Sequence, residues 1–195
     1  FEVQDAGSQK IGEFLDVKPG MRVVDACAGA GGKTLHLAAL MENKGQIIAM
    51  DIHGWKLAEL KRRAKRAGAH NIETREITDN KVIKRLHEKA DRLLIDAPCS
   101  GLGVLKRNPD SKWKIDQDFI DRIRKEQETI LQDYSKIIKK GGKMVYATCS
   151  ILPSENNEQV ENFLKNNSDF KLIKEEKVMP STGFDGFYMA LIERV

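Results

Sequence analysis

The stretch Asp25-Ala-Cys-Ala-Gly-Ala-Gly-Gly-Lys-Thr34 decides how this chain folds. It closes the apolar run at residues 21–25, which predicts a buried strand, and leads into residues 35–41, whose spacing favours a helix. A strand, a glycine-rich turn and a helix form the opening unit of a nucleotide-binding α/β sheet, because glycine lets a ligand approach the backbone closely. The next apolar run ends in Asp51, where such a unit places a ribose-binding carboxylate.

Spacing excludes two other kinds of glycine-rich turn. A Walker phosphate loop has the pattern Gly-x-x-x-x-Gly-Lys-Thr, and here only Gly32-Lys-Thr34 matches, because the first glycine is missing. The dinucleotide-binding pattern Gly-x-Gly-x-x-Gly is also absent, since the turn has Gly29-Ala-Gly-Gly-Lys33. The turn therefore disfavours an NAD-dependent dehydrogenase.

The composition indicates one soluble domain. The chain has 195 residues, of which 41% are hydrophobic and 32% charged, enough for one core and hardly for two. No apolar run approaches the roughly 18–20 residues of a membrane helix. The net charge of +4 is compatible with a nucleic-acid partner without requiring one. Three cysteines at irregular spacing argue against a disulfide framework and favour a reducing cytoplasm.

Strands and helices alternate along the rest of the chain. The predicted strands are residues 21–25, 46–51, 71–77, 91–96, 143–148, 170–173 and 187–192. The predicted helices lie within residues 1–15 and at 35–41, about 55–67, 81–89, 116–140 and after 153, the fifth ended by Gly141-Gly142. This order predicts a doubly wound α/β domain, with a mostly parallel sheet, helices on both faces and an antiparallel last strand.

Residues suited to binding or catalysis gather where the predicted strands end. These are residues 27–33, Asp51, Asp79, residues 96–103 and Cys149. In doubly wound sheets the ligand crevice lies outside the carboxyl ends of the strands. Acids are unfavourable at buried strand ends unless they meet donors such as the hydroxyls and amines of a ligand. The sequence therefore predicts one ligand site at this edge.

Cys99 and Cys149 follow strands that we expect to be neighbours, about 4.8 Å apart, so both thiols can reach one cavity. Packing of both as small apolar residues stays an equal alternative on spacing alone. A zinc site is disfavoured, because no two cysteines form a Cys-x-x-Cys pair. The four histidines share no spacing, and we interpret them as surface residues: His36, His53, His70 and His87.

The helix at about 55–67 carries one strongly basic face. Its members are Lys61, Arg62, Arg63, Lys65 and Arg66. A solvated helix face and a contact with RNA phosphates both fit this pattern.

Together these motifs resemble the Nop/Sun family of RNA cytosine-5 methyltransferases. The resemblance rests on the glycine-turn stretch, Asp51, Asp96-Ala-Pro-Cys-Ser-Gly-Leu-Gly103 and Ala147-Thr-Cys-Ser150. It extends to residues 4–9, 106–110 and 185–190, and so spans the chain. One departure is Ala30, where the family usually has proline, which changes the stiffness of the turn and removes no side-chain contact.

The resemblance implies that residues 1–195 form one Rossmann-like class I methyltransferase domain with S-adenosylmethionine as methyl donor and no metal. Asp51 would bind the ribose hydroxyls, which suits a carboxylate because it accepts two donors at once. Asp79 would bind the adenine amine, and Asp96 would lie near the methyl group and the target base. The methionine part would be held by Cys27, Ala28, Gly29, Ala30, Gly31, Gly32 and Lys33.

The resemblance also implies the roles of the two cysteines. Carbon 5 of cytosine is a poor nucleophile until a thiolate adds to carbon 6. In the family the Thr-Cys cysteine, here Cys149, makes this bond, and the Pro-Cys cysteine, here Cys99, assists product release. Asp96 would hydrogen-bond the edge of the cytosine. DNA cytosine-5 methyltransferases use their Pro-Cys cysteine as the nucleophile instead.

The expected substrate is RNA, ribosomal rather than transfer RNA, and we expect a cytoplasmic monomer without a membrane partner. Family members usually carry an RNA-binding segment before this domain, and a chain that starts at Phe1 is expected to lack it. Two alternatives stay open. One is a methyltransferase acting on another acceptor, such as tRNA or a molecule other than RNA, with cysteines that only pack. The other is a catalytically silent RNA-binding module.

Overall fold

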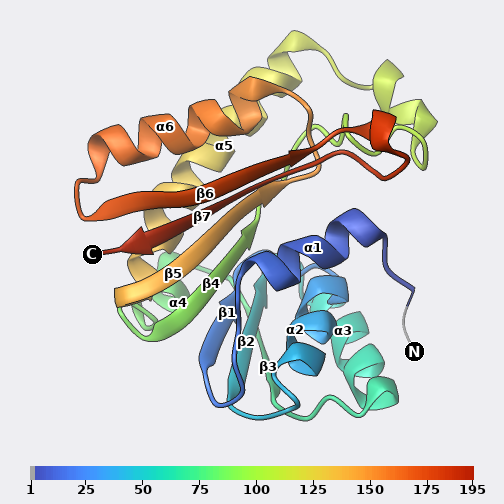
Figure 1. The fold of residues 1–195 in the computed structure, drawn as a ribbon. Helices are drawn as coiled ribbons and strands as arrows, with labels where there is room; N and C mark the ends of the chain where they lie inside the picture. The colour runs from blue at the N-terminus through green and yellow to red at the C-terminus, as the bar shows by residue number, and fades with distance from the viewer. Residues whose placement is uncertain (1–2) are drawn as a thin grey trace.

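The computed structural model describes residues 3–195 and centres on a seven-stranded sheet (Figure 1). The strands are β1 (Arg22–Asp25), β2 (Gln46–Asp51), β3 (Ile72–Glu76), β4 (Ala90–Asp96), β5 (Ile138–Thr148), β6 (Phe170–Val178) and β7 (Phe187–Arg194). The α-helices are α1 (Ala6–Phe14), α2 (Gly32–Leu40), α3 (Gly54–Ala67), α4 (Asn80–Lys84), α5 (Gln117–Tyr134) and α6 (Asn157–Asn166). Four short 3₁₀ turns complete the described chain: η1 (Pro109–Trp113), η2 (Ser135–Ile137), η3 (Pro153–Glu155) and η4 (Pro180–Thr182). The predicted domain of 1–195 also includes residues 1 and 2, which lie outside the described residues.

The strand order is β3-β2-β1-β4-β5-β7-β6. The first five strands pair in parallel, and β7 lies antiparallel between β5 and β6. This confirms the predicted doubly wound, mostly parallel sheet with an antiparallel last strand. The order reverses between β1 and β4, which places the switch point of the sheet beside the glycine-rich turn.

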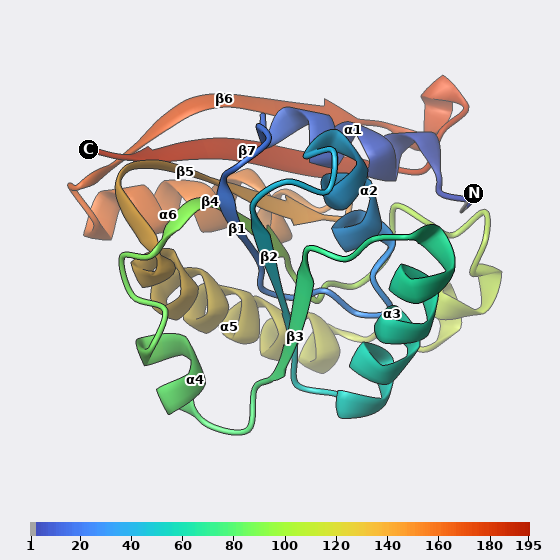
Figure 2. The same ribbon diagram turned by 90° about the horizontal axis from the view of Figure 1, so that it is seen from below.

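Helices cover both faces of the sheet, as Figures 1 and 2 show. Neighbouring residues of β1 illustrate why, because side chains along a strand alternate between faces. Val23 packs with apolar residues of α1 and α2, whereas Val24 packs in the cluster that includes residues of α5 and α6. Both side chains are at most 1% exposed, so the strand is buried on both sides. No helix in the described part of the chain is long and apolar enough to cross a membrane.

Two predicted helices are shorter than their sequence pattern indicated. The helix predicted at 81–89 ends at Lys84, because Glu88 takes a left-handed conformation and the Lys89 N–H bonds the Ile137 carbonyl, leading into β4. The helix predicted at 116–140 ends at Tyr134.

After Tyr134 the chain passes through the short turn η2 into β5. The apolar pair Ile137-Ile138, which also fits a helix face, is fully buried where η2 passes into β5. Gly141-Gly142 lie inside β5 rather than ending the helix. There the β4–β5 register jumps from Ala90↔Ile138 to Arg92↔Lys143, with Gly141 at φ +75°.

The start of α2 is fixed by close contact with its surroundings. Gly31 caps the helix at φ +90°, a conformation that L side chains rarely adopt. A β-carbon built at Gly31 would overlap the Leu60 side chain of α3. Behind the turn, the Thr34 hydroxyl donates to Asp25 Oδ2 over 2.7 Å, which ties α2 to the end of β1.

We expect Gly31→Ala to destabilise the fold by about 2–5 kcal/mol, from the left-handed backbone and the overlap with Leu60 together. Gly32→Ala is the matched control, because its backbone is helical and nothing lies within 4 Å of its added β-carbon. Urea unfolding of both variants measures the difference. Equal stability of the two would contradict this account of the turn.

Asp25 makes the stability depend on pH. Burial raises its pKa from 3.8 to about 7, against the hydrogen bond from Thr34. A carboxyl with a raised folded-state pKa favours the folded state while protonated, so this contribution is lost as the pH rises from about 4 through about 7. The loss amounts to at most about 4 kcal/mol, because one pKa unit corresponds to about 1.4 kcal/mol.

Asp25→Asn should remove this pH dependence, because asparagine does not titrate. Relative to wild type, the variant should gain stability as the pH rises, and the gain should level off above about pH 7. Urea unfolding from about pH 4 to about pH 8 measures both proteins. Parallel pH profiles would show that Asp25 is not the titrating group.

Candidate active site

A cavity of about 330 Å³ opens at the carboxyl ends of β1, β2 and β4. Backbone of the glycine-rich turn and the two acids Asp51 and Asp96 line it. The other side is largely apolar and includes Ile52, Ile77, Pro98, Ile130 and Tyr134. A cavity therefore lies at the edge of the sheet where the sequence predicts a ligand site.

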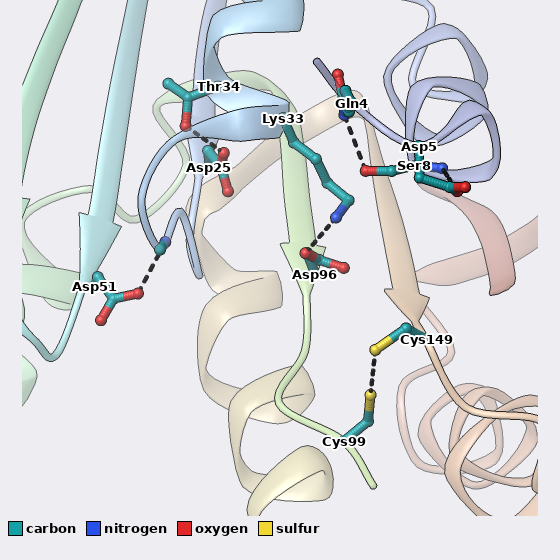
Figure 3. A network of polar contacts seen from close by, with 11 residues as sticks. Gln4, Asp5, Ser8, Asp25, Lys33, Thr34, Asp51, Asp96, Cys99 and Cys149 are labelled. Carbon is teal, nitrogen blue, oxygen red and sulfur yellow. Dashed lines mark hydrogen bonds and ion pairs between the residues drawn. The ribbon is translucent and has the colours of Figure 1, made fainter. Parts of the chain in front are cut away.

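Asp51 is held rigidly at the mouth of β2. Its Oδ2 accepts the Gly29 N–H at 2.9 Å (Figure 3). Its Oδ1 accepts the His53 N–H at 2.8 Å. The residue is 7% exposed, so the carboxylate is largely removed from water while it lines the cavity. Each carboxylate oxygen can accept a second hydrogen bond, so the pair of backbone donors leaves capacity for a ligand.

The predicted cofactor residues do not all face the cavity. Cys27 and Gly29 line it, and burial raises the pKa of Cys27, which keeps that thiol neutral. Ala28, Ala30, Gly31 and Gly32 build the turn behind it, where the Ala30 carbonyl accepts the Arg63 guanidinium at 2.8 Å.

Asp79 is exposed outside the cavity lining. Its Oδ1 accepts the Lys81 N–H at 2.7 Å and caps α4.

Lys33 points from the start of α2 towards the end of β4 (Figure 3). Its ammonium group lies 2.7 Å from Asp96 Oδ2, and the two side chains are only 15% and 26% exposed. Burial alone would lower the pKa of Lys33, but the charge and the hydrogen bond of Asp96 outweigh it and raise the pKa. Lys33 therefore keeps its positive charge, beside the end of β5.

Cys99 and Cys149 lie side by side, as we expected from their position after neighbouring strands. β4 and β5 pair in parallel up to Asp96↔Ala147, and the Sγ atoms of Cys99 and Cys149 lie 3.3 Å apart (Figure 3). The contact with Cys149, together with burial, raises the pKa of Cys99. The same hydrogen bond lowers the pKa of Cys149 against burial and the charge of Asp96, which raise it, and Lys33 also lowers it. This arrangement favours a thiolate at Cys149 and a thiol donor at Cys99.

The remaining sequence candidates fall outside the cavity, with the exception of His53. His53 and His70 are exposed as predicted, whereas His36 and His87 are partly buried, and burial lowers the pKa of both. No group of three or more His, Cys, Asp or Glu side chains within residues 3–195 could hold a metal ion.

On the basic face of α3, Lys61, Arg62, Lys65 and Arg66 are exposed. Arg63 instead supports the glycine-rich turn through its bond to the Ala30 carbonyl.

Two parts of the site were missed by the sequence analysis. Ile130 and Tyr134 of α5 line the cavity, and their spacing of four residues could have placed both on one helix face. Glu155 is fully buried behind the two cysteine loops. It had no recognisable signal, because an acid after Pro153-Ser154 looks like an exposed residue at the start of a helix.

Comparison with known proteins gives one family. Residues 13–192 match the family described as 16S rRNA methyltransferase RsmB/F. The chain is 41% identical over 171 residues to a probable ribosomal RNA small subunit methyltransferase B of Synechocystis sp., a match that covers 87% of this chain and 38% of that protein. The corresponding Bacillus subtilis protein is 38% identical over 170 residues, again covering 87% of this chain and 38% of the relative. The chain therefore spans less than half of the length of these relatives.

A solved structure agrees with these relatives. The crystal structure of NSun6 from Pyrococcus horikoshii with SFG has a TM-score of 0.89 at 29% sequence identity, and the match covers 98% of this chain and 52% of that one. These matches confirm the predicted Nop/Sun resemblance: the chain belongs to the RsmB/F family of S-adenosylmethionine-dependent rRNA methyltransferases.

Proposed function

We propose that this chain transfers the methyl group of S-adenosylmethionine to carbon 5 of a cytosine in ribosomal RNA, through a covalent bond between Cys149 and the base. The observation that carries the proposal is the contact of Cys99 and Cys149 over 3.3 Å, beside the Lys33–Asp96 ion pair. Two cysteines that only packed would need no ammonium group beside them that lowers the pKa of one thiol.

The cavity fits the proposed methyl donor in size and chemistry. Its volume of about 330 Å³ lies within the range of small-molecule sites, about 300–1,000 Å³. Asp51 would accept the two ribose hydroxyls, and Ile52, Ile77 and Pro98 offer apolar surface to a flat base. Asp79, with one carboxylate oxygen not used by its helix cap, would accept the adenine amine. The turn from Cys27 to Lys33 would hold the methionine part. When bound, the donor supplies an electrophilic methyl group on a sulfonium sulfur.

The residues at the ends of β4 and β5 supply the rest of the chemistry. The Cys149 thiolate adds to carbon 6 of the cytosine, which makes carbon 5 nucleophilic enough to take the methyl group. Asp96 hydrogen-bonds the edge of the base, and its ion pair with Lys33 orients that carboxylate. After methyl transfer, a base removes the proton from carbon 5 and the bond from Cys149 to carbon 6 breaks. Cys99, which contacts the Cys149 sulfur, assists this release.

Ribosomal RNA is the proposed substrate because the matched family and the curated relatives are named for it. The exposed lysines and arginines of α3 offer a surface for RNA phosphates. A helix face that only contacts water is the alternative interpretation of the same residues.

Asp51→Ala should weaken binding of S-adenosylmethionine about ten- to hundredfold, because two buried hydroxyls lose their acceptor, at about 1–3 kcal/mol. Isothermal titration calorimetry measures the affinity, and circular dichroism checks that the variant is folded. Asp118→Ala, which removes an exposed acid from α5, is the control and should bind normally. Unchanged affinity in folded Asp51→Ala would remove Asp51 from the site.

The two cysteines should fail in different ways. With ribosomal RNA and S-adenosylmethionine, Cys99→Ala should accumulate a covalent protein–RNA complex, because bond formation continues while release is slowed. Cys149→Ala should form none. A denaturing gel separates the RNA-linked protein as a slowly migrating band.

Three other outcomes are informative. A band from Cys149→Ala alone would make Cys99 the nucleophile, as in the DNA enzymes. If both variants still methylate RNA, the two cysteines only pack as small apolar residues and take no part in the reaction. Methylation of an acceptor other than cytosine, read by mass spectrometry with labelled donor, would reject the proposed base.

A further inference from the structure

Behind the two cysteines lies a buried carboxylate that the proposed reaction does not use. Glu155 of η3 is 0% exposed. Its Oε1 accepts the Ser100 N–H at 2.8 Å and the Gln127 side-chain amide at 3.1 Å. Its Oε2 accepts the Ser100 hydroxyl at 2.5 Å and also the Ser150 hydroxyl. Four donors therefore converge on one side chain.

Two of the residues that Glu155 binds directly follow the two cysteines in sequence. Ser100 follows Cys99 on the loop after β4, and Ser150 follows Cys149 on the loop after β5. The two serine hydroxyls also lie 3.1 Å from each other. The β4–β5 ladder ends before both loops, so this carboxylate is a direct link between them where the thiols meet.

The turn that carries Glu155 is itself anchored to β5. The Tyr146 hydroxyl donates to the Glu155 carbonyl at 2.8 Å. The next residue, Asn156, accepts the Thr148 hydroxyl at 2.6 Å and donates to the Ser150 carbonyl at 3.0 Å. The carboxylate is therefore held in place from the strand side and can act as a fixed point for both loops.

The hydrogen-bond donors around Glu155 indicate more than a packing role for its carboxylate. No Lys, Arg or His among residues 3–195 is seen to form an ion pair with it, so only neutral donors compensate its burial. A buried carboxylate costs more than an apolar residue of the same volume, and what it supplies in return is directional hydrogen bonding. Its negative charge also adds to the effect of the Cys149 contact and of burial, which raise the pKa of Cys99.

We propose that Glu155 is a positioning residue for the methyl transfer: through Ser100 and Ser150 it holds Cys99 against Cys149, so that both sulfur atoms reach the same base. The part of this inference that concerns catalysis rests on the proposed function, whereas the placement of the thiols can be tested without any substrate.

The first test measures how readily the two thiols bridge. Diamide accepts two electrons and two protons from a pair of thiols, and the sulfur atoms join when they can approach from 3.3 Å to about 2.05 Å. Wild type should form the Cys99–Cys149 disulfide rapidly, measured by mass spectrometry of the linked peptides. Glu155→Ala should slow bridging about tenfold or more, because the loops lose their common acceptor. Glu158→Ala, an exposed acid of α6, is the matched control and should match wild type.

Glu155→Gln separates positioning from loss of packing. Glutamine has the same length, its oxygen can accept from Ser100 N–H and Gln127, and its amide can donate to the two hydroxyls. We expect it to restore most of the bridging rate that Glu155→Ala loses. If Glu155→Ala does not fold, Ser150→Ala removes one arm of the link and should slow bridging on its own. The proposal is overturned if a folded Glu155→Ala forms the disulfide as fast as wild type. If Glu155→Ala does not fold, a wild-type rate in Ser150→Ala overturns it.

The second test uses RNA and S-adenosylmethionine. Displacing a reacting group by about 1 Å costs about 100-fold in rate, so Glu155→Ala should lower kcat by about that factor. The KM for S-adenosylmethionine should change little, because Glu155 does not line the cavity, and Glu155→Gln should recover most of kcat. A matching rise in KM without loss of kcat would indicate a general structural role and overturn the catalytic part. One outcome separates the two proposals. If Glu155→Ala slows formation of the Cys99–Cys149 disulfide but neither wild type nor any variant methylates cytosine, the proposed function fails and the role of Glu155 in placing the thiols stands.

Discussion

The parallel pairing of β4 with β5 is the interaction on which the site depends. It brings Asp96 beside Ala147, and so delivers the loops that carry Cys99 and Cys149 to one place. Neither loop has regular structure that could achieve this alone, since Pro98 and two glycines interrupt the first. If these strands were not neighbours, the chain would still contain both cysteine motifs, but the two thiols would not be in contact.

The site is made of two halves that meet at an ion pair. The half formed by β1 and β2 contains the glycine-rich turn and Asp51, and the half formed by β4 and β5 contains the thiols. Lys33 belongs to the first half by sequence and reaches into the second through Asp96. One ammonium group thus links the two halves, because it pairs with Asp96 and lowers the pKa of Cys149.

Much of this arrangement could be predicted from the sequence, because strong local signals determine it. Alternating apolar runs and turns predicted the sheet, and acids at strand ends predicted the cavity edge. The ends of α4 and α5 could not be predicted, since Ile137 and Ile138 suit a helix face and a buried strand equally well. Glu155 was missed for a different reason: its role depends on Ser100 and Ser150, which are brought to it only by the folded chain.

The glycine-rich turn is supported from outside by a side chain of α3. Where a proline would fix the backbone covalently, this chain has Ala30, and its carbonyl is held by the Arg63 guanidinium from α3. The stiffness of the turn is therefore non-covalent and shared with a helix whose outer surface is strongly basic. The backbone beside the cavity thus depends on the position of a side chain from α3 and not on a ring within the turn itself.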